Sequence, residues 1–435
     1  MAVGLILAAP SSGSGKTVLT LALLRAFARC EIAVSSFKVG PDYIDPAFHT
    51  AATGRPCRNL DLWAMRPETL GATARDVACG ADLVIGEGVM GLFDGAADGT
   101  SSTADAAVTL GLPVVLVVNT KGQGASVAAL VKGFRDHRSD VTLAGVILNN
   151  VGSEAHRAML TDALEGVTPV LGCVHRDQRL ELPERHLGLV QAAERPDLER
   201  FLDDAAEAVG ASVDLDRLMA VARPPVVGPP ERPAPPLDPL GQRIAIAQDT
   251  AFAFVYPALL DGWRHAGAEL VPFSPLADEA PDSTADAVYL PGGYPELHAG
   301  ELASNDAFLE GLKAAAARGV AVFGECGGFM VLGERLIDGD GESHVMAGLL
   351  PAITSFSAPR LHLGYRRMTV THESPLGPVG TVFRGHEFHY ARLVRQRGTP
   401  LFQATDATGR YFGPTGAVAG RVAGSFLHVI DREGV

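Results

Sequence analysis

The segment APSSGSGKT, at residues 9–17, is the strongest indication of the fold in the first half of the chain. It follows the apolar segment 3–8 and precedes an apolar-periodic segment at 18–29, so the order is strand, glycine-rich loop, helix. Gly13 and Gly15 let successive backbone N–H groups converge on an anion, and the helix N-terminus adds its dipole. The stretch therefore predicts a phosphate-binding loop.

This loop is expected to bind ATP and Mg²⁺. Lys16 would reach the β- and γ-phosphates, and the Thr17 hydroxyl would ligate the metal. The backbone groups around the phosphates would come from Gly13, Ser14 and Gly15. The strict G-x-x-x-x-G-K-[ST] pattern has glycine where this chain has Pro10, so the loop is a variant. The alternative is a surface Gly-Ser turn that happens to precede Lys-Thr.

Two further segments offer groups to the metal and the phosphates. Glu87 ends the apolar strand 81–86, at the edge where open α/β sheets place ligands, and we expect it to hold Mg²⁺. In FKVGPDYIDPAFH, residues 37–49, Lys38 would neutralise a transferring phosphoryl group, and Asp42 or Asp45 would complete the metal shell. A solvated strand-end acid is the alternative for Glu87, and turn formation beside proline is the alternative for the two aspartates.

Five other polar residues are assigned to ligand contacts. Asn149, at the end of the strand 144–149, would read the adenine edge together with Asn150, with strand-end capping as the alternative. The substrate would be contacted by Tyr43, His49 and Asp94.

A second site is predicted at GECGG, residues 324–328, between the strand 320–323 and the helical segment 329–335. Small residues on both sides of Cys326 are what a nucleophile elbow requires. The helix N-terminus would lower the thiol pKa and offer backbone N–H groups to an oxyanion. His428, in GSFLH near the C-terminus, is the expected base. His386 and His389 lie in a strand-like segment without the H-E-x-x-H spacing, so structural or substrate-lining roles are favoured there.

The chain divides at a segment in which half of the residues are proline, 224–239, which we interpret as a linker. The domains are then 1–222, a linker at 223–240, and 241–435. Apolar runs alternate with helical segments in the first domain, at 3–8, 32–38, 83–86, 114–119, 144–149 and 169–174, which predicts a parallel sheet covered by helices. The second domain begins the same way, with strands at 243–247, 287–290 and 320–323 and helices at 256–265 and 306–318.

The composition and charge of the chain argue against some classes of binding partner. A formal charge of -14 argues against nucleic acid and anionic membranes, and no apolar run is long enough to cross a bilayer. Five scattered cysteines without a C-x-x-C pair favour a reducing cytoplasm.

Seven segments in order, APSSGSGKT, FKVGPDYIDPAFH, GEGVMGLFDG, LPERHLGL (182–189), YLPGGYPELHAGELASN, GECGGFM and FHYARL, resemble the cobyrinic acid and hydrogenobyrinic acid a,c-diamide synthases of cobalamin biosynthesis. The resemblance covers nearly the whole chain. It implies an α/β protein with an ATP-dependent, dethiobiotin-synthetase-like P-loop domain and a class I glutamine amidotransferase domain. It also implies an oxyanion hole at Gly293 and Gly327, L-glutamine as nitrogen donor and a corrinoid substrate; a homodimer is left open.

One departure separates this chain from the broad class I pattern. His-x-Glu is common there, whereas the order here is His428, Val429, Ile430, so the orienting carboxylate is missing. We expect a backbone carbonyl or a side chain outside this segment to orient His428. The alternatives for the whole chain are a nickel-sirohydrochlorin diamide synthase, cobyric acid synthase or, more remotely, a partner-regulated ATPase switch.

Overall fold

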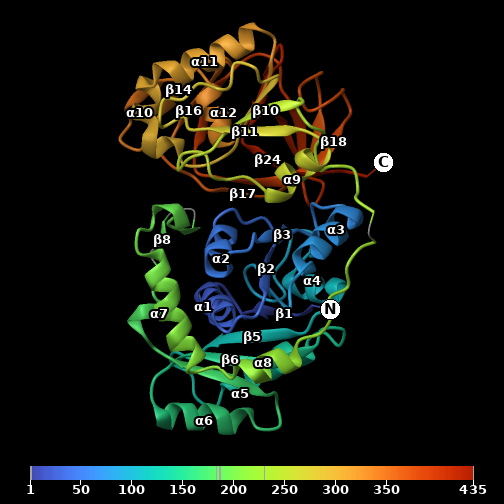
Figure 1. Ribbon diagram of the computed structural model, residues 1–435, viewed down its shortest axis with the longest axis vertical. Coiled ribbons are helices and arrows are strands. Elements are labelled where there is room, and N and C mark those ends of the chain that lie inside the picture. Colours follow the sequence, from blue (N-terminus) through green and yellow to red (C-terminus); the bar gives the residue numbers. More distant parts are fainter. Residues whose placement is uncertain (1, 183, 186–187, 230, 435) are drawn as a thin grey trace. The chain divides into compact units, whose positions relative to one another are not determined.

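The computed structural model describes residues 2–182, 184–185, 188–229 and 231–434. The chain forms two compact units, one from Met1–Leu62 and Leu70–Arg232 and the other from Trp63–Thr69 and Pro233–Val435. Both units contain a parallel sheet flanked by helices, which confirms the predicted α/β class (Figure 1).

The first unit is built on a seven-stranded sheet in which every pairing is parallel. Its strands are short and buried, as expected for a sheet covered on both faces. In spatial order they are β3 (Arg58–Leu60), β2 (Val34–Val39), β4 (Leu83–Glu87), β1 (Val3–Ala8), β5 (Val114–Asn119), β6 (Leu143–Val151) and β7 (Val170–His175).

Helices lie on both faces of this sheet. Figure 1 shows α1 (Lys16–Arg29), α2 (Asp45–Thr53) and α7 (Leu198–Gly210) on one side, with α3 (Pro67–Ala78) and α4 (Thr103–Leu110) on the other. The unit is completed by α5 (Val127–Asp136), α6 (Glu154–Leu164), α8 (Leu215–Val221), the short helices η1 (Gln178–Leu180) and η2 (Ala192–Glu194), and the strand pair β8 (Glu184–Arg185) and β9 (Gly188–Leu189). Because β2, β4 and β1 lie side by side and run parallel, the loops that follow them meet at one edge of the sheet.

The proline-rich segment forms no helix and no named strand among its described residues. Its first part follows the first unit, where the N–H of Val226 donates to Leu110 O and that of Gly228 donates to Gly71 O. Its later part belongs to the second unit, where Trp263 Nε1 donates to the carbonyl of Leu237. Proline therefore keeps the segment extended, while the residues between the prolines dock it.

The second unit has a six-stranded sheet, parallel except for one edge strand. Its order is β11 (Glu269–Phe273), β10 (Arg243–Ala247), β12 (Ala287–Leu290), β13 (Ala321–Glu325), β23 (Val422–Ser425) and β22 (Ala417–Ala419). The accompanying helices are α9 (Pro257–His265), η3 (Pro295–His298), α10 (Ala299–Ser304), α11 (Asp306–Ala317) and α12 (Gly327–Leu332).

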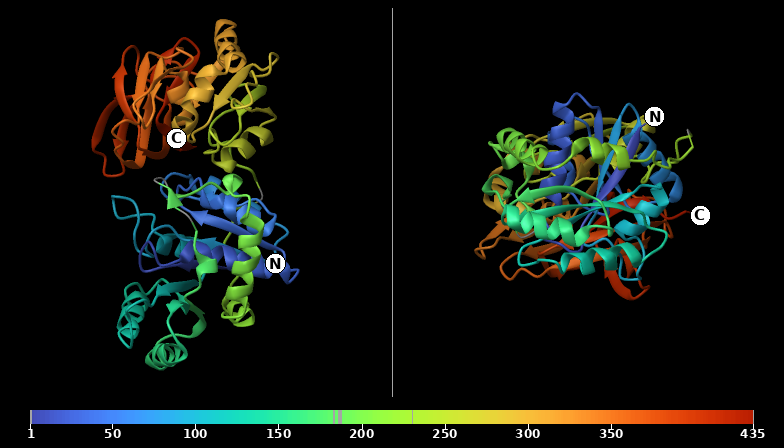
Figure 2. Two further views of the ribbon diagram at one scale, coloured as in Figure 1. Left: turned by 90° about the vertical axis from the view of Figure 1, so that its left-hand side faces the viewer. Right: turned by 90° about the horizontal axis from the view of Figure 1, so that it is seen from below.

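Two smaller sheets make up the rest of this unit, drawn in orange and red in Figure 2. One has the order β21 (Tyr411–Thr415), β20 (Phe402–Asp406), β17 (His362–Val370), β18 (Val382–His389) and β24 (Leu427–Arg432), and all its pairings are antiparallel. The other has the order β15 (Ser343–Val345), β14 (Arg335–Ile337), β16 (Ala352–Ser355) and β19 (Arg392–Gln396). Since β23 and β24 are nearly consecutive, the chain passes from the parallel sheet to the antiparallel one within a few residues of Phe426.

Residues Trp63–Thr69 fold with the second unit. The Trp63 ring stacks on Tyr365 with centroids 4.6 Å apart, and the backbone N–H and guanidinium of Arg66 donate to the buried carboxylate of Asp431.

None of the helices within the described residues combines the length and hydropathy needed to span a membrane.

Candidate active sites

The loop between β1 and α1 has the conformation predicted for a phosphate loop. Gly13 and Gly15 adopt the left-handed region, with φ of 76° and 82°, and Gly15 caps the N-terminus of α1. The Ser14 hydroxyl donates to the carbonyl of Ser11 and stabilises the turn. Lys16 and Thr17 then begin α1, so both side chains project from the same helix end.

Glu87 is the centre of a cluster of charges at this edge of the sheet. It is fully buried at the end of β4, beside Lys38 of β2 in the parallel register. Its Oε1 accepts hydrogen bonds from Thr17 Oγ1 at 2.6 Å, Lys38 Nζ at 2.8 Å and Lys16 Nζ at 3.1 Å. Asp45 joins the cluster, with its Oδ2 2.5 Å from Lys38 Nζ and 3.4 Å from Thr17 Oγ1. Residues from four elements thus converge as expected from the sheet order.

Charge pairing controls ionisation in this cluster. Burial raises the pKa of Glu87, but Lys38, Lys16 and His49 outweigh it and hold that pKa well below its ordinary value. Burial also lowers the pKa of Lys38, and the carboxylates of Asp45 and Glu87 outweigh it in the opposite direction. Glu87 and Lys38 are therefore both charged although both are buried.

Asp45 and Lys16 are held less firmly in their charged forms. Burial and the neighbouring carboxylate of Asp42 raise the pKa of Asp45 to about 6. Burial and the charge of Lys38 lower the pKa of Lys16. Asp42 itself lies 3.6 Å from Lys38 Nζ, and its Oδ1 accepts from the N–H groups of Ile44 and Asp45. The turn role considered as an alternative for Asp42 is therefore present in the structure.

His49 differs from the expectation that it contacts substrate. Its ring is fully buried in α2, with Nε2 2.7 Å from Glu87 Oε2 and Nδ1 3.6 Å from Cys57 Sγ. Burial lowers the pKa of His49, but Cys57 and Glu87 outweigh it and raise that pKa to about 10. Both ring nitrogens are engaged behind Glu87, so His49 supports that carboxylate in this structure. The sequence pattern could not separate the two roles because both place histidine in the same loop.

Asn149 contacts the phosphate loop directly. Its Nδ2 donates to the carbonyl of Ser14 at 3.0 Å, and its Oδ1 accepts from the N–H of Asn150. A β-carbon at Gly15 would lie 2.2 Å from the same Nδ2, so glycine is required there for this contact. Asn149 and Asn150 also line a cavity of about 130 Å³ beside the loop, together with Val18, His175, Arg176, Asp177 and Leu180. The adenine contact stays a prediction.

The two remaining predicted ligand residues lie in the segments that follow β2 and β4. Tyr43 is half-buried, and Asp94 is exposed with its carboxylate accepting from the N–H of Gly91. Gly91 passes close to Pro10 of the phosphate loop, because a β-carbon there would lie 2.7 Å from the Pro10 carbonyl. The LPERHLGL segment lies partly outside the described residues, at 183 and 186–187.

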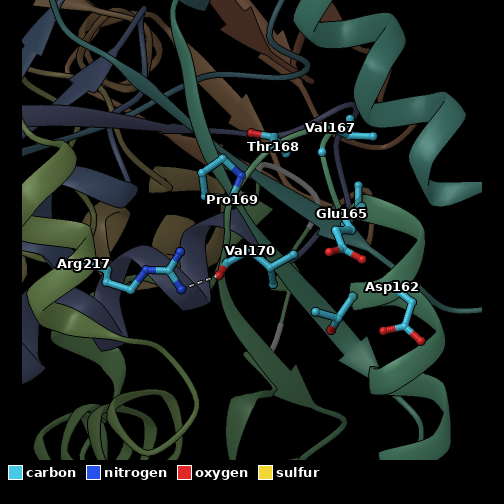
Figure 3. A pocket seen from close by; sticks show the side chains of 10 residues that line it. Asp162, Glu165, Val167, Thr168, Pro169, Val170 and Arg217 are labelled. Atoms are coloured by element: carbon cyan, nitrogen blue, oxygen red, sulfur yellow. Dashed lines mark hydrogen bonds between the residues drawn. The ribbon is translucent and has the colours of Figure 1, made fainter.

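A larger open hollow of about 730 Å³ lies at the start of β7, away from this cluster (Figure 3). It is lined by Asp162, Glu165 and the segment leading to Val170, and Arg217 Nη1 donates to the Val170 carbonyl. The phosphate loop follows the carboxyl end of a parallel strand, whereas this hollow adjoins an amino end. It is therefore not part of the ATP site.

In the second unit, Cys326 occupies the sharp turn between β13 and α12. Its backbone angles, φ 46° and ψ −101°, are strained for a residue with a side chain, and the structure imposes them from both sides. Gly324 and Gly328 pack so closely that a β-carbon on Gly324 would lie 2.7 Å from Gly328 C. This geometry is that of a nucleophile elbow, as predicted.

The expectation of a lowered thiol pKa is wrong for this structure. Cys326 is almost fully buried, and burial raises its pKa, with a further contribution from the carboxylate of Glu296. The Gly327 N–H lowers the pKa, but α12 is only six residues long and cannot outweigh burial. The thiol is therefore neutral until a base removes its proton.

The two residues assigned to the oxyanion hole lie beside each other. A β-carbon at Gly327 would stand 3.1 Å from the backbone nitrogen of Gly293, although the two residues belong to different loops. A β-carbon at Gly293 would lie 2.0 Å from Ala251 O, so its loop packs tightly. The structure thus brings both backbone groups to the elbow.

His428 enters the same region on β24, three residues after Ser425, whose carbonyl accepts from the N–H of Cys326. Burial, with the nearby His386 and His389, lowers the pKa of His428 to about 3. The imidazole is therefore neutral at physiological pH and can accept a proton.

His389, Glu387 and His362 form a neighbouring cluster, with one ligand-type atom from each within 4.8 Å of the others. Arg366 donates to Glu387 Oε2, and His389 Nε2 lies 3.0 Å from Glu387 Oε1. The rings of His362 and His389 are stacked nearly parallel, with centroids 4.7 Å apart. This segment is a strand, as predicted, and its acidic group is paired with a guanidinium.

Comparison with known proteins agrees with this pairing of sites. Residues 5–190 match the CobQ/CobB/MinD/ParA nucleotide-binding domain, and residues 243–434 match the CobB/CobQ-like glutamine amidotransferase domain. The chain is 55% identical to a hydrogenobyrinate a,c-diamide synthase from Sinorhizobium sp over 440 residues, covering 99% of each chain. A synthase of the same name from Rhizobium meliloti (strain 1021) is 56% identical, covering 98% of this chain and 99% of the relative. One from Brucella anthropi is 54% identical, covering 98% of each.

The chain belongs to the hydrogenobyrinate a,c-diamide synthase family, and it is an enzyme with a glutamine amidotransferase domain and a nucleotide-binding domain. The resemblance recognised in the seven sequence segments is thereby confirmed.

Proposed function

We propose that this enzyme converts the a and c carboxylates of hydrogenobyrinic acid into amides, using ATP for activation and glutamine as the nitrogen donor. The observation that carries the proposal is the presence, in one chain, of a charged phosphate loop and a strained thiol elbow. Each suits one half of such a reaction. The corrin substrate follows from the name that its close relatives carry.

Activation belongs to the first unit. A corrin carboxylate attacks the γ-phosphorus of ATP, the bond to the bridging oxygen breaks, and an acyl phosphate and ADP form. Lys16 and Lys38 are placed to balance negative charge on the transferring group. Ammonia then attacks the acyl carbon and forms the amide. Inorganic phosphate leaves and carries away one oxygen of the original carboxylate.

Mg²⁺ fits the oxygen donors of this cluster. The Thr17 hydroxyl stands 2.6 Å from a Glu87 oxygen and 3.4 Å from an Asp45 oxygen, and hydroxyl and carboxylate oxygens are the ligands that Mg²⁺ prefers. Thr17, Glu87 and Asp45 would hold the ion, with Asp42 at the margin. When bound, the ion supplies charge neutralisation at the β- and γ-phosphates.

Ammonia is released in the second unit. His428 takes the proton of the Cys326 thiol as the sulfur attacks the amide carbon of glutamine, and the N–H groups of Gly293 and Gly327 stabilise the oxyanion. His428 returns this proton to the departing nitrogen, so collapse of the intermediate expels ammonia and leaves a thioester, which water hydrolyses to glutamate and the free thiol. Since all five cysteines are free thiols, we place the enzyme in the cytoplasm.

The experiment is to incubate the enzyme with MgATP, glutamine and either hydrogenobyrinic or cobyrinic acid, and to follow product mass. We expect two amidations of hydrogenobyrinic acid. A preference for the cobalt-bearing acid, or amidation only of a nickel sirohydrochlorin or of other corrin carboxylates, would assign the alternative substrates instead. ATP hydrolysis without amide formation from any of them would contradict the proposal.

A further inference from the structure

Glu325, the last residue of β13, lies next to the thiol and close to the base. It is almost fully buried. Its Oε1 accepts from the N–H of Val429 at 2.9 Å, and its Oε2 accepts from the hydroxyl of Tyr289 at 2.6 Å. The same Oε2 stands 3.7 Å from Nδ1 of His428. The Glu325 carboxylate therefore contacts β24, the strand that carries His428, and lies on the Nδ1 side of the imidazole.

The other edge of the imidazole faces a different loop. A β-carbon at Gly292 would lie 2.5 Å from Cε1 and 3.2 Å from Nε2 of His428. Gly292 precedes Gly293, whose backbone nitrogen adjoins Gly327 of the elbow. Nδ1 thus faces Glu325, and Nε2 faces the loop that carries one of the oxyanion donors.

We propose that Glu325 is the positioning residue of His428, in place of the carboxylate that is missing at Ile430. At 3.7 Å the two groups are beyond hydrogen-bond distance. On closing to hydrogen-bond range when glutamine is bound, Glu325 accepts from Nδ1–H, keeps the proton on that nitrogen and leaves the Nε2 lone pair for the Cys326 thiol. The negative charge also stabilises the imidazolium that forms when the thiol loses its proton. The inference rests on the proposed thiol chemistry of Cys326 and His428.

Glu387 is the nearest rival for this role. It lies on β18, adjacent to β24, but its Oε2 accepts from Arg366 and its Oε1 faces His389. The polar contacts of Glu387 are thus made with Arg366 and His389. Glu325 instead accepts a hydrogen bond from the N–H of Val429, the residue after His428.

The pH profile separates Glu325 from its neighbours. Burial raises the pKa of Glu325 to about 7, whereas the pKa of His428 is lowered to about 3, so the imidazole stays neutral while Glu325 ionises. The other titratable groups around this pair are Tyr289, Cys326, His386, His389, Glu296 and Glu387. Positioning by the ionised carboxylate predicts that glutamine hydrolysis rises as the pH increases through about 7.

The first test is glutamine hydrolysis by Glu325→Gln, measured against pH in the presence of MgATP and the corrin acid. A neutral amide can present its NH₂ to Nδ1 and select the wrong tautomer, so we expect kcat to fall on the order of 100-fold, with KM for glutamine changed by less than about threefold. The rise near pH 7 disappears, and amidation with ammonium salts is unchanged. Asp431→Asn is the matched control, because Asp431 is a buried carboxylate on the same strand as His428 that pairs with Arg66.

Tyr289→Phe is the second test, independent of the charge change. The Tyr289 hydroxyl lowers the pKa of Glu325, so its removal moves the rise in hydrolysis to higher pH. Unaltered kcat in Glu325→Gln, or an unmoved rise in both variants, would overturn the inference. If wild type hydrolyses glutamine with this pH profile but amidates no corrin, the proposed function fails and the role of Glu325 stands.

Discussion

Two strands of this molecule end in the same way and behave in opposite ways. β4 has the sequence LVIGE and β13 the sequence AVFGE, each runs through the middle of a parallel sheet, and each terminal glutamate is buried. Yet the pKa of Glu87 lies well below its ordinary value, whereas that of Glu325 is raised to about 7. Burial alone therefore does not decide the charge of a carboxylate; its partners do.

The partners match the chemistry proposed at each site. Glu87 contacts two ammonium groups and a histidine, whereas the polar contacts of Glu325 are a phenol, a backbone N–H and an imidazole with a low pKa. Charges already present suit ATP and Mg²⁺, which arrive charged. A nearly neutral site suits glutamine, because charge then develops only in the transition state.

The largest effect is expected at the phosphate loop. Lys16→Ala removes a cation from the β- and γ-phosphates and should lower amide formation on the order of 10³-fold with either glutamine or ammonium as nitrogen source. Product mass measures the rate, and the exposed Lys121→Ala serves as the control. Normal turnover with ammonium would mean that activation takes place elsewhere.

Cys326→Ala should separate the two sites. Without its nucleophile the enzyme loses glutamine-dependent amidation, whereas ammonium salts at raised pH still support it, because activation does not use the thiol. The two nitrogen sources are compared in one assay, with Cys79→Ala, an exposed cysteine, as the control. A folded Cys326→Ala protein that ammonium cannot rescue would contradict this division of labour.

Glu87→Gln tests the charged side of the comparison. The change leaves Lys16 and Lys38 without their shared counter-charge in a buried place, which should cost about 3–5 kcal/mol in the free energy of unfolding. Because the pKa of Glu87 is lowered, its contribution is present above pH 4.5 and is lost as the pH falls through the folded-state value. Denaturant titrations from pH 7 downwards should show the gap to wild type closing, and a gap independent of pH would argue against the pairing.

Glu325→Gln tests the nearly neutral site. Unlike Glu87→Gln, it should raise the free energy of unfolding. The folded-state pKa of Glu325 is raised from 4.5 to about 7, so wild type loses stability as the pH rises across that interval. The variant avoids an ionised buried carboxylate and should gain up to about 3 kcal/mol at pH 8, with a smaller gain at pH 5. Equal destabilisation at both pH values would show that the carboxylate is paired in a way that the contacts of Glu325 do not reveal.

Much of the fold was predictable because its signals are local. The strands 3–8, 114–119, 243–247 and 287–290 were predicted with the observed bounds, since continuous apolar runs mark buried parallel strands. The helical segment 329–335 was placed too late: α12 begins at Gly327 and ends at Leu332, and Arg335 starts β14. The two smaller sheets, built from β14–β21 and β24, could be predicted only as strand-like sequence, because their pairing depends on contacts distant in sequence.

The site residues divide in the same way. Short sequence patterns are enough to propose roles for Gly13, Gly15, Lys16, Thr17, Glu87, Cys326 and His428, and these roles stay predictions. His49, expected to contact substrate, instead contacts Glu87 and Cys57, and no pattern assigns a role to Glu325. The signal for Glu325 was present, a charged residue at the end of an apolar run, and it is the same signal that singled out Glu87.

The positions of the two strand-end glutamates, the phosphate loop and the thiol elbow follow from local sequence, because apolar runs, glycines and strand–loop–helix order are local properties of the chain. The groups that each glutamate contacts depend instead on how the chain folds in three dimensions. Lys38 and His49 reach Glu87 from β2 and α2, and Tyr289 and His428 reach Glu325 from β12 and β24. The charge of a buried carboxylate is set by such partners, which come from distant parts of the chain.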